Sequence, residues 1–214
     1  MKLLTEPYLK QVTRWPGAGR HILAQFDQNC VVVYQAFSPA ISNFALKHGY
    51  FGGEFKLSRM SWIKTNFLWM MYRSGWGTKA GQEVVLAIWL KRKAFDKILT
   101  YAVHSSYIPE LYPSKAEWQL TLRQSPVRLQ WDPDYNPCQK PMKRRAIQLG
   151  LRGWILSSYA RNWIENIEDI SDFVNQQYPN RLLRNQEKLL TPTEFVYPVT
   201  DLSVAKQIGL SIEV

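Results

Sequence analysis

The sequence has few of the residues that build metal centres, disulfide frameworks or histidine-based active sites. Its 214 residues include two cysteines and three histidines. Cys30 lies in an apolar run and Cys138 in a proline-rich loop, which fits neither a disulfide framework nor a zinc site. No histidine has a carboxylate at helical ligand spacing, so no metal is expected. This cysteine usage favours a cytoplasmic location.

Long hydrophobic runs and the common catalytic motifs are also missing. No window approaches the roughly 18 apolar residues that cross a membrane, and the first residues, MKLLTEPYLKQ, lack the apolar core of a signal peptide. We therefore expect neither membrane insertion nor secretion. The absence of GxGxxG, a P-loop, HExxH, GxSxG and CxxC removes support for Rossmann, P-loop, zinc-protease, hydrolase and thiol-redox functions.

Positive charge is abundant and unevenly distributed. Residues 1–150 contain 21 Lys and Arg against 9 Asp and Glu, a net +12, whereas residues 151–214 contain 6 against 8, a net −2. A positive field of this size attracts phosphates in a nucleic acid, a dinucleotide or an acidic protein. A basic face that only keeps the protein soluble is the alternative.

The stretch from Arg59 to Gly81, RMSWIKTNFLWMMYRSGWGTKAG, is the strongest candidate for a binding surface. It has no carboxylate, and it contains three tryptophans and four cations. A helix through FLWMMYR, capped by Thr65 or Asn66, would offer free backbone N–H groups at its amino end to a phosphate or carboxylate. The predicted ligand contacts at the two ends of this helix are Arg59, Trp62, Lys64, Arg73 and Trp76.

The remaining pattern predicts one α+β domain over residues 1–214, with a central mixed or antiparallel sheet and flanking helices. HILAQF and CVVVYQAF read as a hairpin, residues 39–48 as a helix between Ser38 and Gly49, and EVVLAIWL as a buried strand. VRLQWDP, ending at Asp132-Pro133, and AIQLGL read as further strands. Residues 1–150 form a basic main body, and 151–214 a helical C-terminal part in which RGWILSSYARNWIENI and DISDFVNQQY are amphipathic.

Several polar residues fall at the predicted ends of strands, where site residues tend to lie. Each also has an ordinary explanation: Tyr34 as strand packing, Glu83 as a partner of Lys79, and Asp132-Pro133 as a turn. As a group they are candidates for the second wall of a site, and the group includes Tyr34, Gln35, Glu83, Gln130 and Gln148.

The chain resembles an uncharacterised family catalogued as domain of unknown function 4291. The pieces that carry the resemblance are RHILAQFD, VVVYQAF, RMSWIKTNFLWMMYRSGWGTKAGQEVVLAI, VRLQWDPD, RRAIQLGL and IEDIS, spread over about residues 20–175. The resemblance implies a stand-alone domain of this size and brings no established activity.

VVYQAFSPAISNFALKHGY has a fainter resemblance to the ADP-ribosyltransferase group, in which a strand carrying a Tyr-His pair is followed by a helix, a Gly and aromatic residues around nicotinamide. Tyr34-Gln35 takes the place of that pair, and Gln35 departs from the usual His or Arg. The resemblance implies an ADP-ribosyltransferase-like fold, NAD as cofactor, and Glu83 or Gln148 as the polar residue of a later strand. On this resemblance the candidate catalytic residues are Glu83, Gln148 and Tyr34, and Gln35 and Gln130 are further contacts of the cofactor.

Three functions stay open at this point. The first is an NAD-using enzyme that transfers ADP-ribose to a nucleic acid or protein. The second is a non-catalytic nucleic-acid-binding domain, in which Trp62, Trp69 and Trp76 stack on bases. The third is a binder of a phosphorylated small molecule, or a protein-interaction module. A concave site favours an enzyme and an open strip favours nucleic acid.

Overall fold

Two continuous apolar runs form the centre of the molecule. The computed structural model describes residues 2–211. In it, strands β4 (Cys30–Phe37) and β6 (Val84–Lys91) pair antiparallel along their whole length, from Cys30 opposite Lys91 to Phe37 opposite Val84. Both strands are buried on both faces through most of their length, which is why their sequences are apolar without alternation.

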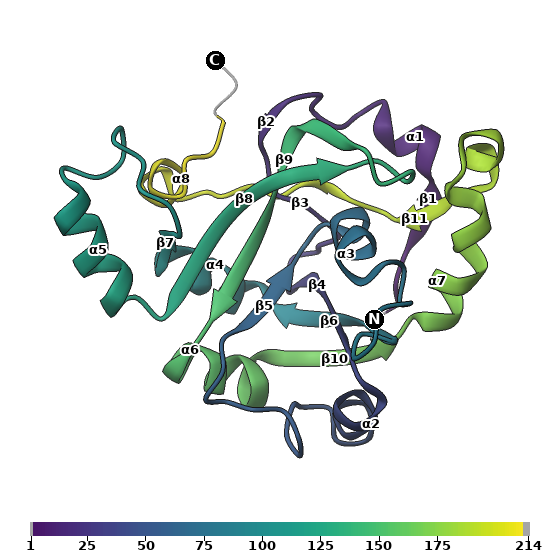
Figure 1. Ribbon diagram of the computed structural model, residues 1–214, viewed down its shortest axis with the longest axis horizontal. Helices are drawn as coiled ribbons and strands as arrows, with labels where there is room; N and C mark the ends of the chain where they lie inside the picture. Colours follow the sequence, from purple (N-terminus) through teal and green to yellow (C-terminus); the bar gives the residue numbers. More distant parts are fainter. Residues whose placement is uncertain (1, 212–214) are drawn as a thin grey trace.

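The two central strands belong to an eight-stranded sheet in the order β10-β6-β4-β5-β9-β8-β7, with β2 added beside β9 (Figure 1). Neighbouring strands are antiparallel except for the parallel pairs β7-β8 and β2-β9, so the predicted mixed sheet is confirmed. The other strands of the sheet are β2 (Gly19–Arg20), β5 (Ser61–Lys64), β7 (Ala102–His104), β8 (Val127–Tyr135), β9 (Pro141–Leu151) and β10 (Ile164–Asp169). Two small sheets pair β1 (Thr5–Pro7) with β11 (Leu190–Pro192), and β3 (Leu23–Ala24) with β12 (Phe195–Val196).

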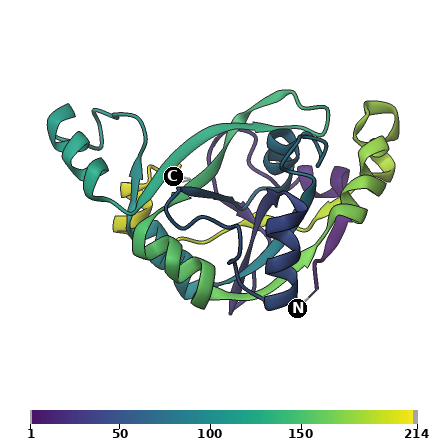
Figure 2. The ribbon, with the colours of Figure 1, turned by 60° about the horizontal axis from the view of Figure 1, so that its bottom comes forward.

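Helices cover both faces of the sheet and give it two apolar cores. One face packs against α4 (Arg92–Thr100), α6 (Gly153–Ser158), the π-helical turn Tyr159–Trp163 and α8 (Leu202–Gln207). The opposite face packs against α1 (Tyr8–Val12), α3 (Phe67–Ser74) and α7 (Ser171–Gln177). Helix α5 (Lys115–Gln124) and helix α7 lie at opposite ends of the molecule (Figures 1 and 2).

The predicted helices at residues 39–48 and 67–74 are confirmed, and their ends explain why. Helix α2 (Pro39–His48) begins after Ser38 and ends at Gly49, whose φ of 73° is the left-handed conformation that glycine adopts without strain. Helix α3 begins at Asn66, whose side chain accepts from the Trp69 N–H, and ends at Gly75 with a φ of 60°. Short 3-10 turns follow α7 at Tyr178–Arg181 and Leu183–Lys188.

The stretch RGWILSSYARNWIENI does not form one helix. The helix ends with the π-helical turn at Trp163, and residues 164–169 form β10, an edge strand paired with β6. The prediction was wrong because the pairing edge of β6 lies far away in sequence, and its backbone bonds outweigh local helical spacing. The C-terminal part is therefore mixed in structure, not wholly helical.

Strand β8 does not end at Asp132-Pro133, as predicted, but continues to Tyr135. Its parallel neighbour β7 pairs only with residues 127–129 of β8. Within residues 2–211, no strand therefore lies beside this edge of β8 at Pro133. Proline lacks only the N–H, and an unpaired edge does not need that donor. The extension carries Asp132 and Asp134 along the sheet.

Within residues 2–211, no helix is long and apolar enough to span a bilayer.

Candidate functional site

Strands β4 and β5 diverge beside the middle of the sheet. They share a single register pair, Tyr34 opposite Lys64, although each pairs extensively with its other neighbour. Beyond that pair the end of β4 and the start of β5 separate. The opening has a volume of about 460 Å³ and is bordered by both strands, by α3, and by the adjoining strands β9 and β8.

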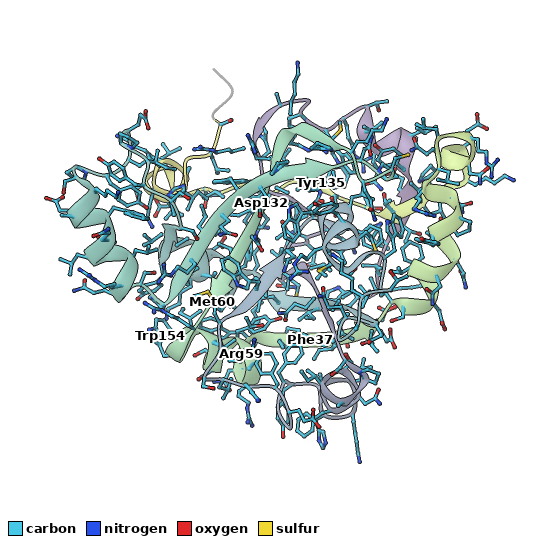
Figure 3. The ribbon with its side chains drawn as sticks, in the orientation of Figure 1. Phe37, Arg59, Met60, Asp132, Tyr135 and Trp154 are labelled. Carbon is cyan, nitrogen blue, oxygen red and sulfur yellow. The ribbon has the colours of Figure 1, made fainter. Side chains whose placement is uncertain are left out.

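This opening, called the cleft below, collects most of the residues predicted from strand ends and from the basic aromatic segment. Its lining is polar in character, with one lysine, one arginine and four glutamines among its side chains. The lining residues are Gln35, Ala36, Phe37, Met60, Ser61, Trp62, Lys64, Met70, Arg73, Gln82, Gln130 and Gln148. In Figure 3, Phe37 and Met60 lie below the middle of the sheet and Asp132 lies above it, along β8.

Lys64 is the buried cation of the cleft. Its side chain is in a residue only 6% exposed, and its Nζ donates one hydrogen bond, to the Trp62 carbonyl oxygen at 3.2 Å. Nζ also lies 5.2 Å from the centre of the Trp69 ring. Burial, with a smaller contribution from the charge of Arg73, lowers the Lys64 pKa to about 7, and Asp132 opposes the shift. No carboxylate among residues 2–211 forms an ion pair with it.

A chain of amide and carboxylate groups forms the wall opposite β4. Register places Lys64 beside Gln148 and Gln148 beside Gln130, so these three side chains share one face of the sheet. Gln148 Nε2 donates to Gln130 Oε1 and to Asp132 Oδ2, both at 2.6 Å. Burial raises the Asp132 pKa, opposed by this bond and by the charge of Lys64. Both N–H groups of Gln148 are thereby used, and its oxygen accepts from no group among the described residues.

Gln35 fastens the two diverging strands to each other. Its Nε2 donates to Ser61 Oγ at 2.8 Å and to the Trp62 carbonyl at 3.0 Å, and its Oε1 accepts from the Tyr159 hydroxyl at 2.7 Å. The residue is buried. With both donors occupied, the Gln35 side chain borders the cleft and holds its shape, and it offers a ligand at most one oxygen lone pair.

Trp62 forms a side of the cleft because the residue opposite it is glycine. Gly150 is registered with Trp62, and a Cβ on Gly150 would lie 3.0 Å from the Trp62 ring and 2.6 Å from the Met60 sulfur. The indole therefore lies across β9 in space that any other residue would occupy.

The amino end of α3, predicted to offer free backbone N–H groups to a ligand, is occupied by a side-chain carboxyl of the chain and by the cap residue. The Phe67 N–H donates to Glu194 Oε1 at 2.7 Å, and the Trp69 N–H donates to Asn66 Oδ1 at 2.7 Å. Glu194 also accepts from Asn66 Nδ2 at 3.1 Å. This carboxyl is buried, and burial raises its pKa to about 8. The helix terminus is thus occupied by a carboxyl of the chain itself. Glu194 is 127 residues from Phe67 in sequence, so no local pattern predicts this contact.

Four of the predicted site residues lie outside the lining of the cleft. Tyr34 is buried beneath α3 against Phe67, and Trp76 is buried at the end of that helix. Glu83 is exposed and accepts from the Gly81 N–H at 2.7 Å. Arg59 lines an adjoining hollow of about 430 Å³, which shares Phe37, Met60 and Ser61 with the cleft.

Two polar side chains, one that lines the cleft and one that bonds to a residue lining it, were passed over in favour of their neighbours. Gln82 lines it although Glu83 had been preferred, and Asp132 bonds to Gln148 although only Gln130 had been assigned a contact. Alternation along a strand would have grouped Gln130 with Asp132, two residues apart on one face. Residues 2–211 contain no cluster of three or more His, Cys, Asp or Glu side chains suited to a metal ion.

The family assignment follows from comparison with known proteins. The family described as domain of unknown function (DUF4291) matches residues 21–197, which include β4, β5, α3, β8 and β9. The chain belongs to this family. No protein with a curated description matches it.

Proposed function

We propose that the cleft binds NAD and that the protein is an ADP-ribosyltransferase-like enzyme acting on a nucleic acid or protein. The observation that carries the proposal is the convergence of side chains from five elements on one concave, polar opening beside the strand with the Tyr34-Gln35 pair. The convergent residues named from sequence are Gln35, Trp62, Lys64, Arg73, Gln130 and Gln148.

The charges of the cleft suit a pyrophosphate. Arg73 is exposed at the end of α3 and carries a permanent positive charge, and Lys64 supplies a second that depends on pH. Neither forms an ion pair with a carboxylate among residues 2–211. The half-buried Trp62 offers an aromatic surface to a nicotinamide or adenine ring. A dinucleotide satisfies both kinds of group at once.

In the proposed reaction the bond between the ribose C1 and the nicotinamide nitrogen breaks, and nicotinamide leaves with the electron pair. A nucleophile of the acceptor bonds to C1 and releases its proton. Positive charge develops on the ribose, so a nearby carboxylate and amide oxygen stabilise the transition state. Gln148 lines the cleft with an unused oxygen, and Asp132, which lines a neighbouring hollow, accepts from its amide; we assign these two groups to this role. Tyr34 is buried beneath α3 and Glu83 is exposed away from the cleft, so neither is assigned a part in the step.

Calorimetric titration with NAD tests the binding step. Arg73→Gln is expected to weaken NAD binding by about tenfold to a hundredfold, the usual loss when a charged hydrogen bond to phosphate is removed. Lys115→Met is the matched control, since Lys115 is an exposed cation on the distant α5 (Figure 1). No binding of NAD at millimolar concentration, or equal loss in both variants, would reject the proposal. Labelled NAD with candidate acceptors then tests transfer.

The nucleic-acid-binding alternative loses part of its support. Of the three tryptophans in that hypothesis, Trp69 and Trp76 are buried, and Trp62 alone is accessible to stack on a base. Oligonucleotide binding that is tighter than NAD binding and falls steeply with salt would nevertheless replace the NAD proposal.

A further inference from the structure

Lys64 presents an amine to the cleft, and not only a charge. Its Nζ donates to one carbonyl oxygen, and no group among residues 2–211 donates a hydrogen bond to it. A neutral amine at this position would keep its lone pair free. The side chain is nine-tenths buried, yet it lines an opening large enough for a small phosphorylated molecule.

The charged and titratable groups around Lys64 come from three elements. Arg73 reaches the cleft from α3 and disfavours a second positive charge, whereas Asp132 on β8 favours it. Tyr34 on β4 lies opposite Lys64 in register, and burial raises the pKa of its hydroxyl, which therefore stays neutral. Burial is the largest influence and the charge of Arg73 adds to it, so the Lys64 pKa is lowered to about 7 although Asp132 opposes the shift. A large fraction of the amine is therefore unprotonated at neutral pH.

We propose that Lys64 is a nucleophile that captures aldehydes carrying a phosphate group. An amine in a desolvated pocket beside another cation is the arrangement that activates lysine toward carbonyl carbon. Arg73 supplies the phosphate-binding charge on the same cleft. The ligand class is therefore a sugar phosphate or other phosphorylated aldehyde, bound by Arg73 through phosphate and by Lys64 through carbon.

The reaction needs no further reagent. The Nζ lone pair adds to the aldehyde carbon, the carbonyl oxygen takes up a proton, and the resulting carbinolamine loses water to leave a carbon–nitrogen double bond. The proton that leaves nitrogen returns to solvent, and one water is released for each adduct. Asp132, the carboxyl whose charge acts on Lys64 and whose own pKa burial raises, can exchange these protons through water.

Reductive trapping tests the inference without NAD. The whole protein is incubated at pH 7 with glyceraldehyde 3-phosphate and cyanoborohydride, and modified lysines are located by peptide mass spectrometry. Lys64 is expected to be modified at least about tenfold faster than the exposed Lys115, because its lowered pKa leaves a large fraction of its amine neutral at pH 7. The rate at Lys64 should reach half its maximum near pH 7.

Two variants and one ligand analogue control for folding and for phosphate. Lys64→Arg keeps the cation, and after its thermal transition is shown to be native-like it should lose the fast adduct. Unphosphorylated glyceraldehyde should react with Lys64 more slowly than the phosphate ester, and Arg73→Gln should remove that difference. Modification of Lys64 no faster than of Lys115 would overturn the nucleophile, and indifference to phosphate would overturn the ligand class. Failure of NAD to bind affects neither result.

Discussion

Two buried cations on the same face of the sheet have opposite surroundings. Arg144, on β9 and 4% exposed, donates to Asp134 Oδ2 through Nε at 2.8 Å and Nη2 at 2.5 Å, and to the Pro16 carbonyl at 2.8 Å. Its guanidinium also lies over the Trp15 ring. Lys64 lies on β5, the strand next to β9. Its Nζ contacts one carbonyl oxygen, that of Trp62, and lies near the Trp69 ring.

The contrast separates a cation that stabilises the fold from one that is available to a ligand. The charge of Arg144 is compensated by the chain, since Asp134 is also buried and pairs with it. The charge of Lys64 has no such partner among residues 2–211 and is reduced by loss of a proton. Buried charge without a built-in counter-charge costs stability, and a binding site is the usual place where that cost is retained.

Replacing each of the two buried cations by methionine should give the largest difference in the free energy of unfolding. Arg144→Met is expected to lower the free energy of unfolding by about 3–5 kcal/mol, because it leaves Asp134 buried without its partner. Lys64→Met should change that free energy by less than about 1 kcal/mol at pH 7, or raise it, since it removes an uncompensated group. Urea unfolding measures both.

Restoring neutrality distinguishes loss of the ion pair from loss of packing. Adding Asp134→Asn to Arg144→Met should recover part of the stability, since the unpaired carboxyl is gone. Equal destabilisation by Arg144→Met and Lys64→Met would contradict the comparison.

The pH dependence of stability should reveal Lys64 next. Its pKa is about 7 in the folded protein against an ordinary 10.5, so between these values the unfolded chain binds more protons than the folded one. Stability attributable to Lys64 therefore rises with pH across this window, by an amount on the order of 1 kcal/mol per pH unit. The difference in unfolding free energy between wild type and Lys64→Met, followed from pH 7 to 10, measures it.

Taking the difference between the two proteins removes the contribution of Glu194. Its raised pKa of about 8 acts in the opposite direction, because the folded state then holds the extra proton and stability falls as pH rises from 4.5 through 8. Glu194 is present in both proteins. A difference that stays flat between pH 7 and 10 would show that Lys64 is protonated throughout.

The smallest expected effect concerns the side wall of the cleft. Gly150→Ala places a methyl group where Trp62 and Met60 now lie, so the indole must move toward the cleft. We expect a loss of roughly 1–3 kcal/mol in stability and a larger relative loss in NAD binding, measured by thermal unfolding and calorimetry. Gly17→Ala is the matched control, since nothing lies within 4 Å of a Cβ there. Unchanged ligand binding in Gly150→Ala would remove Trp62 from the site.

Local sequence signals predicted what local contacts determine. Asn66 caps the start of α3, Gly49 and Gly75 end α2 and α3, and Pro39 suits the first position of α2; all of these act within one helical turn. Strand β10 was missed because its identity depends on β6, about 80 residues earlier. The continuation of β8 through Pro133 depends in turn on how far β7 extends.

The residues of the candidate site show the same difference between local signals and tertiary contacts. Lys64, Gln130 and Gln148 lie together on the cleft, because the strand register places them side by side on one face of the sheet. Tyr34 and Trp76 are part of the core instead, and both pack against Phe67 of α3. Glu194 could not be linked to α3 from sequence, since the two meet only through the path of the C-terminal segment.

The single register pair between β4 and β5 divides the sheet into two groups of paired strands. One group of strands is β10-β6-β4, and the other is β5-β9-β8-β7 with β2 beside β9. Within residues 2–211, the strand register joins the two groups only at Tyr34 and Lys64. Beyond this register pair, within residues 2–211, no strand pairs with one side of β4, although β4 lies in the middle of the sheet. The cleft is thus a gap in the backbone pairing of the sheet. Its width is set by the hydrogen bonds of Gln35 to β5 and by the Tyr34–Lys64 register pair.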